Sequence, residues 1–378
     1  MENTKKKILF TATVWGFFNF LGNDIRMLTE AGWEVHVATN FNYINKPIVI
    51  DGIVVKHQID FARSPLKKDN ITAYRQLKAL LRQEHFDIVH CHTVIASVLT
   101  RLAAKRYRKS GTRLFYTAHG FNFYKGAPAK NWLLYYPVER LLSRVTDLQI
   151  TINKEDYALA KKRLFAAETV YVPGVGIDLE RFSKGRTDAE AKRAELGVKD
   201  DEIMLLSVGE YSARKNHSVV IKALAGMERR DIKLFIAGNG KLEKELKELS
   251  SALGMGERVN VMGYRTDISQ LCQAADAFIL PSHYEGLSVA LMEAIACETP
   301  VLCSRIRGSV DLVTDEEWMF DQRSVEDTAA CLANTIGSRS RGEFAAYAAE
   351  TVKKNREHLE AFGSAAVAER MREIYGLQ

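Results

Sequence analysis

Two glutamates, Glu285 and Glu293, are the residues of this chain best placed to do chemistry. They lie in the segment PSHYEGLSVALMEAIACETPVL (281–302), with seven residues between them. Glu285 follows an apolar run and precedes a glycine, and Glu293 lies inside a helical pattern that begins near Ser288. A strand, a glycine-containing loop and a helix N-terminus in succession form a natural anion site.

The start of this predicted helix would supply contacts to a phosphate. The N–H groups of Leu287, Ser288 and Val289 would point at the anion. Glu293, about two turns further on, could accept hydrogen bonds from a sugar diol. Alternatively, both acids merely favour the positive end of a helix dipole. Because a carboxylate in an apolar helix is costly unless it is paired or used, the segment suggests a nucleotide-sugar site.

Basic residues and a histidine follow two other apolar runs. Arg214 and Lys215, in GEYSARKNH (209–217), could neutralise a diphosphate. The alternative is a pair of exposed basic residues ahead of a helix. His119, in YTAHGF (116–121), could bond a sugar hydroxyl or an acceptor, or could be a satisfied core histidine.

Three weaker signals limit the choice of function. The Gly238-Asn239-Gly240 turn lacks the third glycine of a dinucleotide fingerprint, which argues against an oxidoreductase. Gly263-Tyr264-Arg265 follows an apolar run and could bracket a nucleobase through its backbone groups. His90 and His92 flank Cys91 without a matching ligand set, so no metal site is expected.

These candidates need a scaffold, and the sequence predicts alternating strands and helices almost throughout. Strands are predicted at 8–13, 34–39, 87–90, 114–117, 147–151, 169–172, 203–208, 233–237, 259–262, 277–280 and 300–303, with strand and turn over 48–57. Helices are predicted at 20–31, 72–84, 95–109, 131–143, 217–227, 242–253 and 344–375, the last interrupted by Gly363. Such alternation is typical of doubly wound parallel sheets in an α/β protein.

The turn-rich segment VPGVGID (172–178) predicts a hinge between two such units. The expected domains are 1–175 and 176–360, with a last helix over 361–378 that packs back on the first domain. Parallel sheets of this kind bind ligands at the carboxyl ends of their strands. A cleft is therefore expected there, lined by the loops that follow Thr13, Thr117, Val208, Ala237 and Leu280.

Composition points to a globular cytoplasmic protein. The chain has 378 residues, of which 47% are hydrophobic and 26% charged, and its length suggests about two domains. Its five cysteines show no disulfide or metal spacing. Lys5–Lys7 and the apolar run after them look like a signal peptide, but there is no small-residue cleavage site, so a first strand explains them better. No segment reaches the roughly 18–20 apolar residues that span a bilayer.

Positive charge is concentrated in one stretch of the first half. The chain carries a net charge of +6, whereas residues 61–113 contain twelve basic and three acidic residues, a local excess of nine. Such a stretch suits nucleic acid, anionic lipid or an acidic acceptor, or it could be a set of solvated helix faces. No groove-reading motif accompanies it, so nucleic acid is not expected as a partner.

Taken together, these segments resemble the retaining glycosyltransferases of family 4, which have the GT-B fold of two Rossmann-like domains facing a central cleft. The shared marks are VGE…RKNH (208–217), AGNGKLE, VMGYRTDI, the 281–302 segment, and RGSVDLV (307–313) in the place of the family's Gly-Gly-x-x-Glu. TAHGFNFYKG and VPGVGID resemble the branch that builds capsular and exopolysaccharide repeat units.

The resemblance implies a role for each candidate. Glu293 would hold the ribose hydroxyls, and Glu285 would contact the donor sugar and steady developing positive charge. Lys215, with Arg214 close by, would stabilise the leaving nucleoside diphosphate. Gly209 and the N–H groups of Gly286, Leu287 and Ser288 would lie near the phosphates and sugar, and Gly263, Tyr264 and Arg265 would lie beside the base. His119 would be a catalytic residue that faces the sugar and acceptor. The acceptor side would also include Gly16, Asn19 and Phe121.

The resemblance also implies a reaction. A hexose or N-acetylhexosamine would move with retention from a nucleotide-diphosphate sugar, with UDP the expected carrier, to an undecaprenyl-type lipid-diphosphate sugar. The leaving phosphate would take the acceptor proton, and neither metal nor cofactor would be needed. The rivals are a GT-B nucleotide-sugar epimerase or sugar-phosphate synthase, and a non-catalytic nucleotide-sugar or glycan-binding subunit.

Three positions depart from the family pattern. Glu210 stands where an arginine is usual, and we expect it to pair with Arg214, Lys215 or Arg307. The first loop, VWGFFN (14–19), lacks the usual paired glycines, and its aromatic residues could serve an acceptor. Asp311 stands where a glutamate is common.

The segment Phe121–Arg144 mixes aromatic with basic residues. Together with the basic stretch it could sit on an anionic membrane surface and bring a lipid-linked acceptor to the site. The protein would then lie peripherally at the inner face of the cytoplasmic membrane. The alternative is that these aromatic side chains pack in the core of the first domain.

Overall fold

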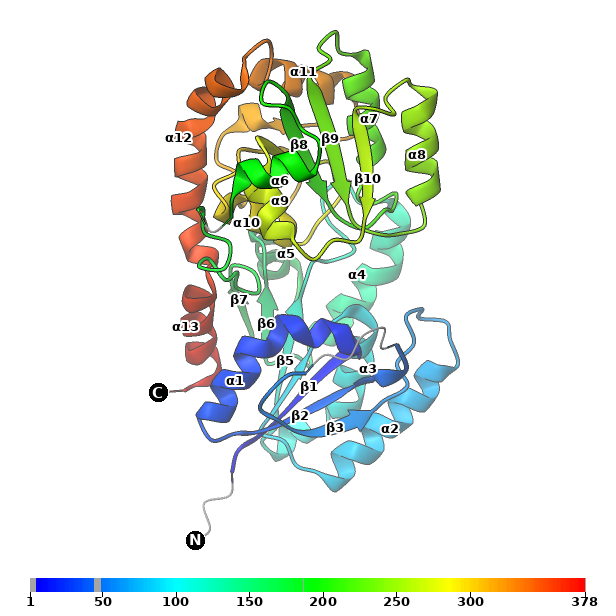
Figure 1. Cartoon of the computed structure of the whole chain (residues 1–378). Coiled ribbons are helices and arrows are strands. Elements are labelled where there is room, and N and C mark those ends of the chain that lie inside the picture. The colour runs from blue at the N-terminus through cyan, green and yellow to red at the C-terminus, as the bar shows by residue number, and fades with distance from the viewer. Residues whose placement is uncertain (1–4, 44–48, 186, 378) are drawn as a thin grey trace. The chain divides into compact units, whose positions relative to one another are not determined.

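The computed structural model describes residues 5–43, 49–185 and 187–377 and divides the chain into two compact units. The first consists of Met1–Gly176 with Ser364–Gln378, and the second of Ile177–Gly363. Each unit, in its described residues, holds one parallel sheet with flanking helices (Figure 1).

The sheet of the first unit has the strand order β3-β2-β1-β4-β5-β6-β7. Its strands are β1 (Lys7–Val14), β2 (Glu34–Asn40), β3 (Ile53–Gln58), β4 (Ile88–Cys91), β5 (Arg113–Ala118), β6 (Leu148–Thr151) and β7 (Glu168–Tyr171). Its helices are α1 (Gly22–Glu30), α2 (Asp69–Gln83), α3 (Val94–Ala104), α4 (Ala129–Ser143), α5 (Lys154–Arg163) and α13 (Ser364–Tyr375), with 3₁₀ helices η1 (Trp15–Leu21), η2 (Phe41–Tyr43) and η3 (Tyr107–Ser110).

The sheet of the second unit has the order β10-β9-β8-β11-β12-β13. Its strands are β8 (Ile203–Val208), β9 (Ile232–Ala237), β10 (Val259–Gly263), β11 (Ala277–Leu280), β12 (Val301–Ser304) and β13 (Met319–Phe320). Its helices are α6 (Ala189–Glu195), α7 (His217–Gly226), α8 (Glu243–Ala252), α9 (Ile268–Ala274), α10 (Val289–Ala296), α11 (Val325–Thr335) and α12 (Arg341–Leu359), with 3₁₀ helices η4 (Glu316–Trp318) and η5 (Glu360–Phe362).

Burial explains why these runs form strands. All four residues of β4, β6, β11 and β12 are buried. Strands of a parallel sheet are covered on both faces, so they read as continuous apolar runs and not as alternating ones. Every strand pairing recorded between the described strands is parallel, and the predicted α/β class with two doubly wound sheets is therefore confirmed.

Two predicted helices are replaced in part by 3₁₀ helices in the structure. The helix expected from residue 20 is preceded by a 3₁₀ helix, η1, and begins at Gly22. The helix expected over 95–109 ends at Ala104, and a separate 3₁₀ turn follows at Tyr107–Ser110. The prediction of one helix over 95–109 was thus wrong, and Gly111, in a left-handed conformation, ends the 3₁₀ helix that precedes β5.

Each sheet has a point at which its strand order reverses. In the first unit β1 lies between β2 and β4, and in the second β8 lies between β9 and β11. The loops that leave two such neighbouring strands run in opposite directions, which opens a crevice at the carboxyl ends of the strands. The loops after β8 and β11 are those that carry the RKNH and YEGLS segments.

The last helix, α13, completes the core of the first unit. Val367, Met371 and Tyr375 are buried among residues of β1, β2 and α1. The Tyr375 hydroxyl donates to the Asp24 carboxylate at 3.2 Å and lies 2.9 Å from His90 Nδ1. Burial raises the pKa of Asp24 to about 7 and lowers that of His90 to about 3, so the histidine stays neutral.

Candidate functional site

A cluster of charged residues lies at the switch point of the second unit. Glu285, in the loop after β11, accepts hydrogen bonds from Lys215 Nζ at 2.6 Å and from Arg214 Nη1 at 2.8 Å. Ser282 Oγ adds a third at 2.8 Å. Lys215 and Glu285 are each 8% exposed. The structure thus brings together three predicted site residues that lie about 70 positions apart in the chain.

The carboxylate of this cluster is ionised despite its burial. Burial by itself would raise the pKa of Glu285, but the charges of Lys215 and Arg214 outweigh it and hold the pKa below its usual value. The cluster therefore places one stable negative charge between two positive ones. Such fixed charges can stabilise charge that develops in a transition state without reorganising.

A buried tyrosine fixes the loop that carries the two cations. Tyr211 is fully buried, and its hydroxyl donates to the carbonyl of Ile236 and accepts from the N–H of Gly263, both at 2.9 Å. It thereby joins the ends of β8, β9 and β10. Gly238 allows this closeness, because a Cβ there would lie 1.9 Å from the carbonyl oxygen of Gly209.

Replacing Tyr211 with phenylalanine is expected to destabilise the second unit by about 1–2 kcal/mol, because the half-buried Gly263 N–H would lose its acceptor. Urea unfolding of the two proteins measures this difference. Tyr264→Phe is the matched control, since Tyr264 is 61% exposed. A Tyr211→Phe protein as stable as the wild type would contradict the role of the hydroxyl.

The segment that follows β12 packs against the loop of Glu285 and holds its backbone. Arg307 is 6% exposed, and its Nε donates to the backbone carbonyl of Glu285 at 3.0 Å. Gly308 has a φ of 79°, and a Cβ there would lie 2.5 Å from the carbonyl oxygen of Gly286. Only glycine permits so close an approach at this φ. Asp311 is also buried in this segment.

The start of α10 has the form that the sequence predicts. Ser288 caps the helix by accepting from the N–H of Leu291. Within the described part of the chain, the backbone N–H groups of Gly286, Leu287 and Ser288 have no protein acceptor. Glu293 lies inside the helix, where burial raises its pKa to about 7 and the charge of Arg181 only partly opposes the shift.

The loop after β10 holds the predicted nucleobase neighbours. The hydroxyl of Tyr211 fixes Gly263, whose φ is 75°. Tyr264 is largely exposed. Arg265 donates to Asp267 with two of its nitrogens, at 2.8 and 2.5 Å, so its charge is already neutralised. Its side chain is not free for a phosphate, in agreement with the backbone role predicted for this loop.

The partner predicted for Glu210 is wrong. Arg214 and Lys215 both pair with Glu285, and Arg307 donates to a backbone carbonyl. Glu210 is exposed. It lies in a tight turn, in which the N–H of Ser212 donates to the Glu210 carbonyl at 2.8 Å. Glu210 therefore lies outside the buried charge cluster.

A second group of predicted residues lies in the first unit. His119 Nε2 is 3.0 Å from His92 Nδ1, and the ring of Phe17 packs edge-on against His119 with a centroid distance of 4.8 Å. Burial lowers the pKa of His119 to about 4, so the ring is neutral at neutral pH. Gly16 and Asn19 are exposed on η1 beside Phe17.

The backbone is strained at the switch point of the first unit, where β1 and β4 are neighbours. Thr93, just after β4, has φ 57° and ψ 151°, a conformation that a β-branched residue rarely adopts. Its hydroxyl accepts from the N–H of Thr13 at 3.0 Å and lies 2.8 Å from the Thr13 hydroxyl. Strain of this kind is held at sites where the geometry matters.

In the segment Phe121–Arg144, the residues exposed to solvent are not the aromatic ones that were expected to face a membrane. Its aromatic residues pack inward: Phe121 and Phe123 are buried, and Trp132, Tyr135 and Tyr136 pack against them. The exposed apolar residues of α4 are instead Leu133, Leu134, Val138 and Leu141. The basic stretch is also less free than its sequence suggests, because Arg101 and Arg108 pair with Glu139 and Asp147, which lie outside it.

Sequence reasoning missed several members of these groups. Ser282 and Tyr211 contact the charge cluster or its loops, and His92 contacts His119. Phe17, which also contacts His119, belongs to the aromatic first loop that was expected to serve an acceptor. His92 lies at the end of a predicted strand next to that of His119, and this placement was the only signal for it. Nothing in the sequence distinguishes Ser282 from other loop serines.

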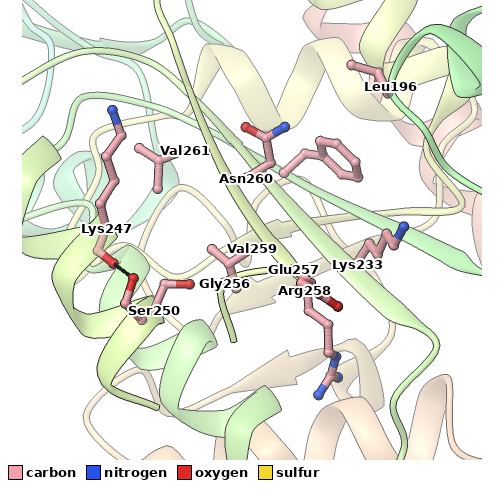
Figure 2. A pocket seen from close by; sticks show the side chains of 12 residues that line it. Leu196, Lys233, Lys247, Ser250, Gly256, Glu257, Arg258, Val259, Asn260 and Val261 are labelled. Atoms are coloured by element: carbon pink, nitrogen blue, oxygen red, sulfur yellow. Dashed lines mark hydrogen bonds between the residues drawn. The ribbon is translucent and has the colours of Figure 1, made fainter. Parts of the chain in front are cut away.

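Not every cavity belongs to these groups. A polar cavity of about 360 Å³ lies beside the edge strand β10, between α8 and the start of that strand (Figure 2). Lys233, Lys247 and Arg258 line it. Lys233 pairs with Glu202, and Lys247 pairs with Glu243. None of the predicted donor-binding residues lines this cavity.

Each half of the chain matches a known family of glycosyltransferases. A family described as Glycosyltransferase Family 4 matches residues 21–181, and one described as Glycosyl transferases group 1 matches residues 188–354. EpsD of Bacillus subtilis (strain 168) is 39% identical over 317 residues, which is 82% of each chain. The chain belongs to glycosyltransferase family 4.

Another relative has a more specific name. The UDP-Gal:alpha-D-GlcNAc-diphosphoundecaprenol alpha-1,3-galactosyltransferase of Escherichia coli is 29% identical over 261 residues. The match covers 65% of this family 4 chain and 66% of the relative.

Solved structures show the same fold. Sucrose-phosphate synthase from Thermosynechococcus elongatus superposes with a TM-score of 0.79 at 20% identity, and the match covers 98% of each chain. Anabaena HepE, solved in complex with UDP and glucose, gives a TM-score of 0.78 at 18% identity over 98% of this chain and 99% of its own. The predicted GT-B fold with two Rossmann-like domains is confirmed.

Among the described residues of this glycosyltransferase, no helix combines the length and the apolar character that crossing a bilayer requires. In the same residues, no three His, Cys, Asp and Glu side chains are grouped so that they could hold a metal ion.

Proposed function

We propose that this glycosyltransferase moves a hexose or N-acetylhexosamine, with retention, from a UDP-sugar to a lipid-diphosphate-linked sugar during capsular or exopolysaccharide synthesis. The observation that carries the proposal is the buried cluster of Glu285, Lys215 and Arg214 at the β8–β11 switch point. Two cations and one carboxylate, next to N–H groups without protein acceptors, suit a diphosphate that leaves from a sugar.

Each member of the cluster has a distinct part in the proposed reaction. Lys215 and Arg214 neutralise the charge that grows on the diphosphate as the glycosidic bond breaks. Glu285 stays ionised and stabilises positive charge on the sugar ring. The N–H groups of Gly286, Leu287 and Ser288 bind phosphate and sugar oxygens. Glu293 accepts hydrogen bonds from the ribose hydroxyls, and Gly209, Gly263, Tyr264 and Arg265 border the nucleotide.

The acceptor side lies in the first unit under this proposal. His119, held by His92, faces the transferred sugar and the acceptor hydroxyl. The leaving phosphate takes the acceptor proton on the same face of the sugar, which accounts for retention without a protein base. The reaction then depends on positioning and fixed charge, and it calls for no cofactor beyond the nucleotide sugar.

The named relatives support the choice of substrates. The Escherichia coli relative is named for a UDP-sugar donor and a diphosphoundecaprenol-linked acceptor. HepE, which shares the fold, was solved with UDP-glucose. EpsD and EpsF of Bacillus subtilis are 39% and 27% identical to this chain.

A donor screen tests the proposal. Purified protein meets UDP-, GDP- and ADP-sugars in thermal-shift and nucleotide-release assays, with and without a short lipid-diphosphate sugar, beside Glu293→Ala. We expect one UDP-sugar to raise the melting temperature, less so in the variant, and UDP release to require the acceptor. UDP release or epimer formation without an acceptor would favour an epimerase. Binding without turnover would favour a non-catalytic binding subunit.

The pKa of Glu293 predicts how stability depends on pH. The folded protein keeps the Glu293 proton up to about pH 7, whereas the unfolded chain releases it near the ordinary value of 4.5. Stability is therefore lost as pH rises through this window. Glu293→Gln removes that loss, so the variant should be more stable than the wild type at pH 8 by on the order of 2 kcal/mol. Equal pH profiles in urea unfolding would contradict the burial of a titrating carboxyl.

We further propose that the first unit binds an anionic membrane surface through α4. Leu134, Val138 and Leu141 form an exposed apolar stripe at helical spacing. Exposed Lys130, Arg140 and Arg144 flank it. The only acid of α4, Glu139, is buried. Apolar residues with basic neighbours are typical of helices that lie in the interface of anionic bilayers.

Vesicle flotation checks this membrane surface. We expect vesicles that contain phosphatidylglycerol to carry the protein and neutral phosphatidylcholine vesicles to carry little. Leu141→Glu should weaken the binding severalfold, whereas Leu253→Glu, at an exposed leucine of the second unit, should not. Absence of binding to both kinds of vesicle would refute the proposal.

A further inference from the structure

An apolar cavity with an open mouth lies between α3 and α4 in the first unit. Its volume is about 350 Å³, within the roughly 300–1,000 Å³ of small-molecule pockets. Val98 and Leu99 line it from α3, Leu134 and Val138 from α4, and Tyr116 and Phe123 from β5 and the loop after it. The helices that form its walls appear beside the first sheet in Figure 1.

The polar side chains buried in its wall are already satisfied. Asn70 accepts from the N–H of Ala62 and donates to the carbonyls of Ser64 and Pro65. Glu139 accepts two hydrogen bonds from Arg101, at 2.6 and 2.9 Å. Neither side chain calls for a polar ligand. The cavity is therefore suited to hydrocarbon, whose burial is favourable in proportion to the apolar area removed from water.

The mouth of the cavity is apolar and basic. Leu66 is 93% exposed and Leu134 is 64% exposed, and both also line the cavity. Lys67 and Lys68 follow Leu66 directly, and exposed Lys130 precedes Leu134 by one helical turn. Exposed leucines beside lysines, at the entrance of an apolar cavity, suit a chain that ends in an anionic group.

The cavity is continuous with the loop of the expected acceptor residue. The loop after β5 carries His119, and the next residues, Gly120, Phe121 and Asn122, form part of the cavity wall. A lipid-linked sugar at His119 would thus have its lipid part next to this opening. His119 and the residues that line the cavity all belong to the first unit.

We propose that the α3–α4 cavity binds a segment of the isoprenoid chain of the lipid-linked acceptor. The lining of the cavity by itself indicates a ligand with a single hydrocarbon chain and an anionic end. That this ligand is the acceptor rests on the proposed function. A phospholipid acyl chain is the other source of that chemistry. The loop that carries His119 borders the cavity and would bring the lipid of the acceptor itself to the mouth, whereas a phospholipid acyl chain has no such tether.

Direct probe binding tests the cavity without vesicles and without catalysis. Dansyl-labelled farnesyl phosphate is titrated into the full-length protein and followed by fluorescence, in parallel with a dansyl-labelled straight-chain fatty acid. We expect saturable binding of the farnesyl probe, at least fivefold tighter than that of the straight chain. Tighter binding of the straight chain would overturn the assignment to the acceptor, and no binding of either would overturn the cavity as a lipid site.

Two adjacent leucines give a matched pair of variants. Leu134→Glu puts a charge at the mouth, and we expect at least a tenfold loss of probe affinity. Leu133→Glu makes the same change one residue away, where the side chain is 76% exposed and does not line the cavity, and should bind the probe as the wild type does. Equal losses in both variants would refute the site. Val98→Trp, which fills the cavity, should abolish binding and serves if Leu134→Glu fails to fold.

The acceptor assay separates this inference from the proposed function. With a methyl-diphospho-sugar acceptor, Leu134→Glu should turn over as the wild type does, whereas with a farnesyl-diphospho-sugar its KM should rise at least tenfold. Loss of activity with both acceptors would contradict a role confined to the chain. A wild type that binds the farnesyl probe but transfers no sugar would refute the proposed function and leave the lipid site in place.

Discussion

Replacing Lys215 with alanine is expected to lower kcat by roughly 10²–10³-fold, the usual effect of removing one fixed charge from a developing oxyanion. Lys215 Nζ lies 2.6 Å from Glu285, and its side chain is almost fully buried, so water would replace it poorly. Because charge on the diphosphate grows as the bond to the sugar breaks, kcat should fall more than donor affinity. Steady-state kinetics with the donor found in the screen measures both.

A double-mutant cycle shows whether the cluster acts as a unit. Glu285→Gln should also lower kcat, and the double variant Lys215→Ala/Glu285→Gln should be little worse than the worse single variant. Lys222→Ala removes an exposed lysine from α7 and should leave kcat unchanged. Strictly additive losses would mean that the two residues act independently, contrary to the hydrogen bond between them.

Removing Glu139 is expected to have the largest effect on stability, about 3–5 kcal/mol, because it leaves the charge of Arg101 buried without a partner. Arg101 is fully buried, and its guanidinium also lies 4.1 Å above the ring of Tyr116. Burial by itself would lower the pKa of Arg101, but the charge of Glu139 more than offsets this, and the pKa is raised. The variant loses this offset, so the buried charge of Arg101 destabilises its folded state.

Urea unfolding of Glu139→Ala and of Arg101→Met/Glu139→Leu checks this account. The double variant removes both charges and replaces them with apolar side chains of similar size, so it should be close to the wild type in stability. If Glu139→Ala were as stable as the wild type, the pair would not be a buried ion pair in solution. If the double variant were as unstable as the single one, packing and not charge would explain the loss.

The sequence predicts the strands well because their burial leaves a clear trace. Strands such as β11 are buried on both faces and therefore read as short apolar runs between turns. Helix α5 leaves no such trace, because its buried residues are Asp156 and Ala160. The structure shows its cap, in which the Asn153 side chain accepts from the N–H of Asp156.

The candidate site could be predicted residue by residue but not contact by contact. Lys215 and Glu285 each follow an apolar run, yet their meeting depends on β8 and β11 being neighbours in the sheet. Alternation of strands and helices does not determine strand order. The pairing expected for Glu210 was wrong for the same reason: Glu210 is near Lys215 in sequence, but the carboxylate that meets Lys215 comes from the loop after β11.

The exposed leucines of α4 show a second limit. Aromatic and basic residues mark Phe121–Arg144 as unusual, but periodicity does not say which apolar residues face outward. The aromatic rings fill the core because each buries more area than a leucine, and the leucines are left at the surface. The cavity beside them could not be predicted, because its shape depends on the packing of α3 against α4.

The place of α13 has a consequence for how the protein is made. The core of the first unit includes Val367, Met371 and Tyr375, yet the rest of that unit ends at Gly176. At roughly 5–20 residues per second, a ribosome needs on the order of ten seconds or more to add the residues in between. During that time the first unit has left the ribosome without its last helix, and the hydrophobic residues that α13 will cover remain exposed to solvent and to chaperones. We therefore expect the second unit, although synthesised later, to reach its native core first.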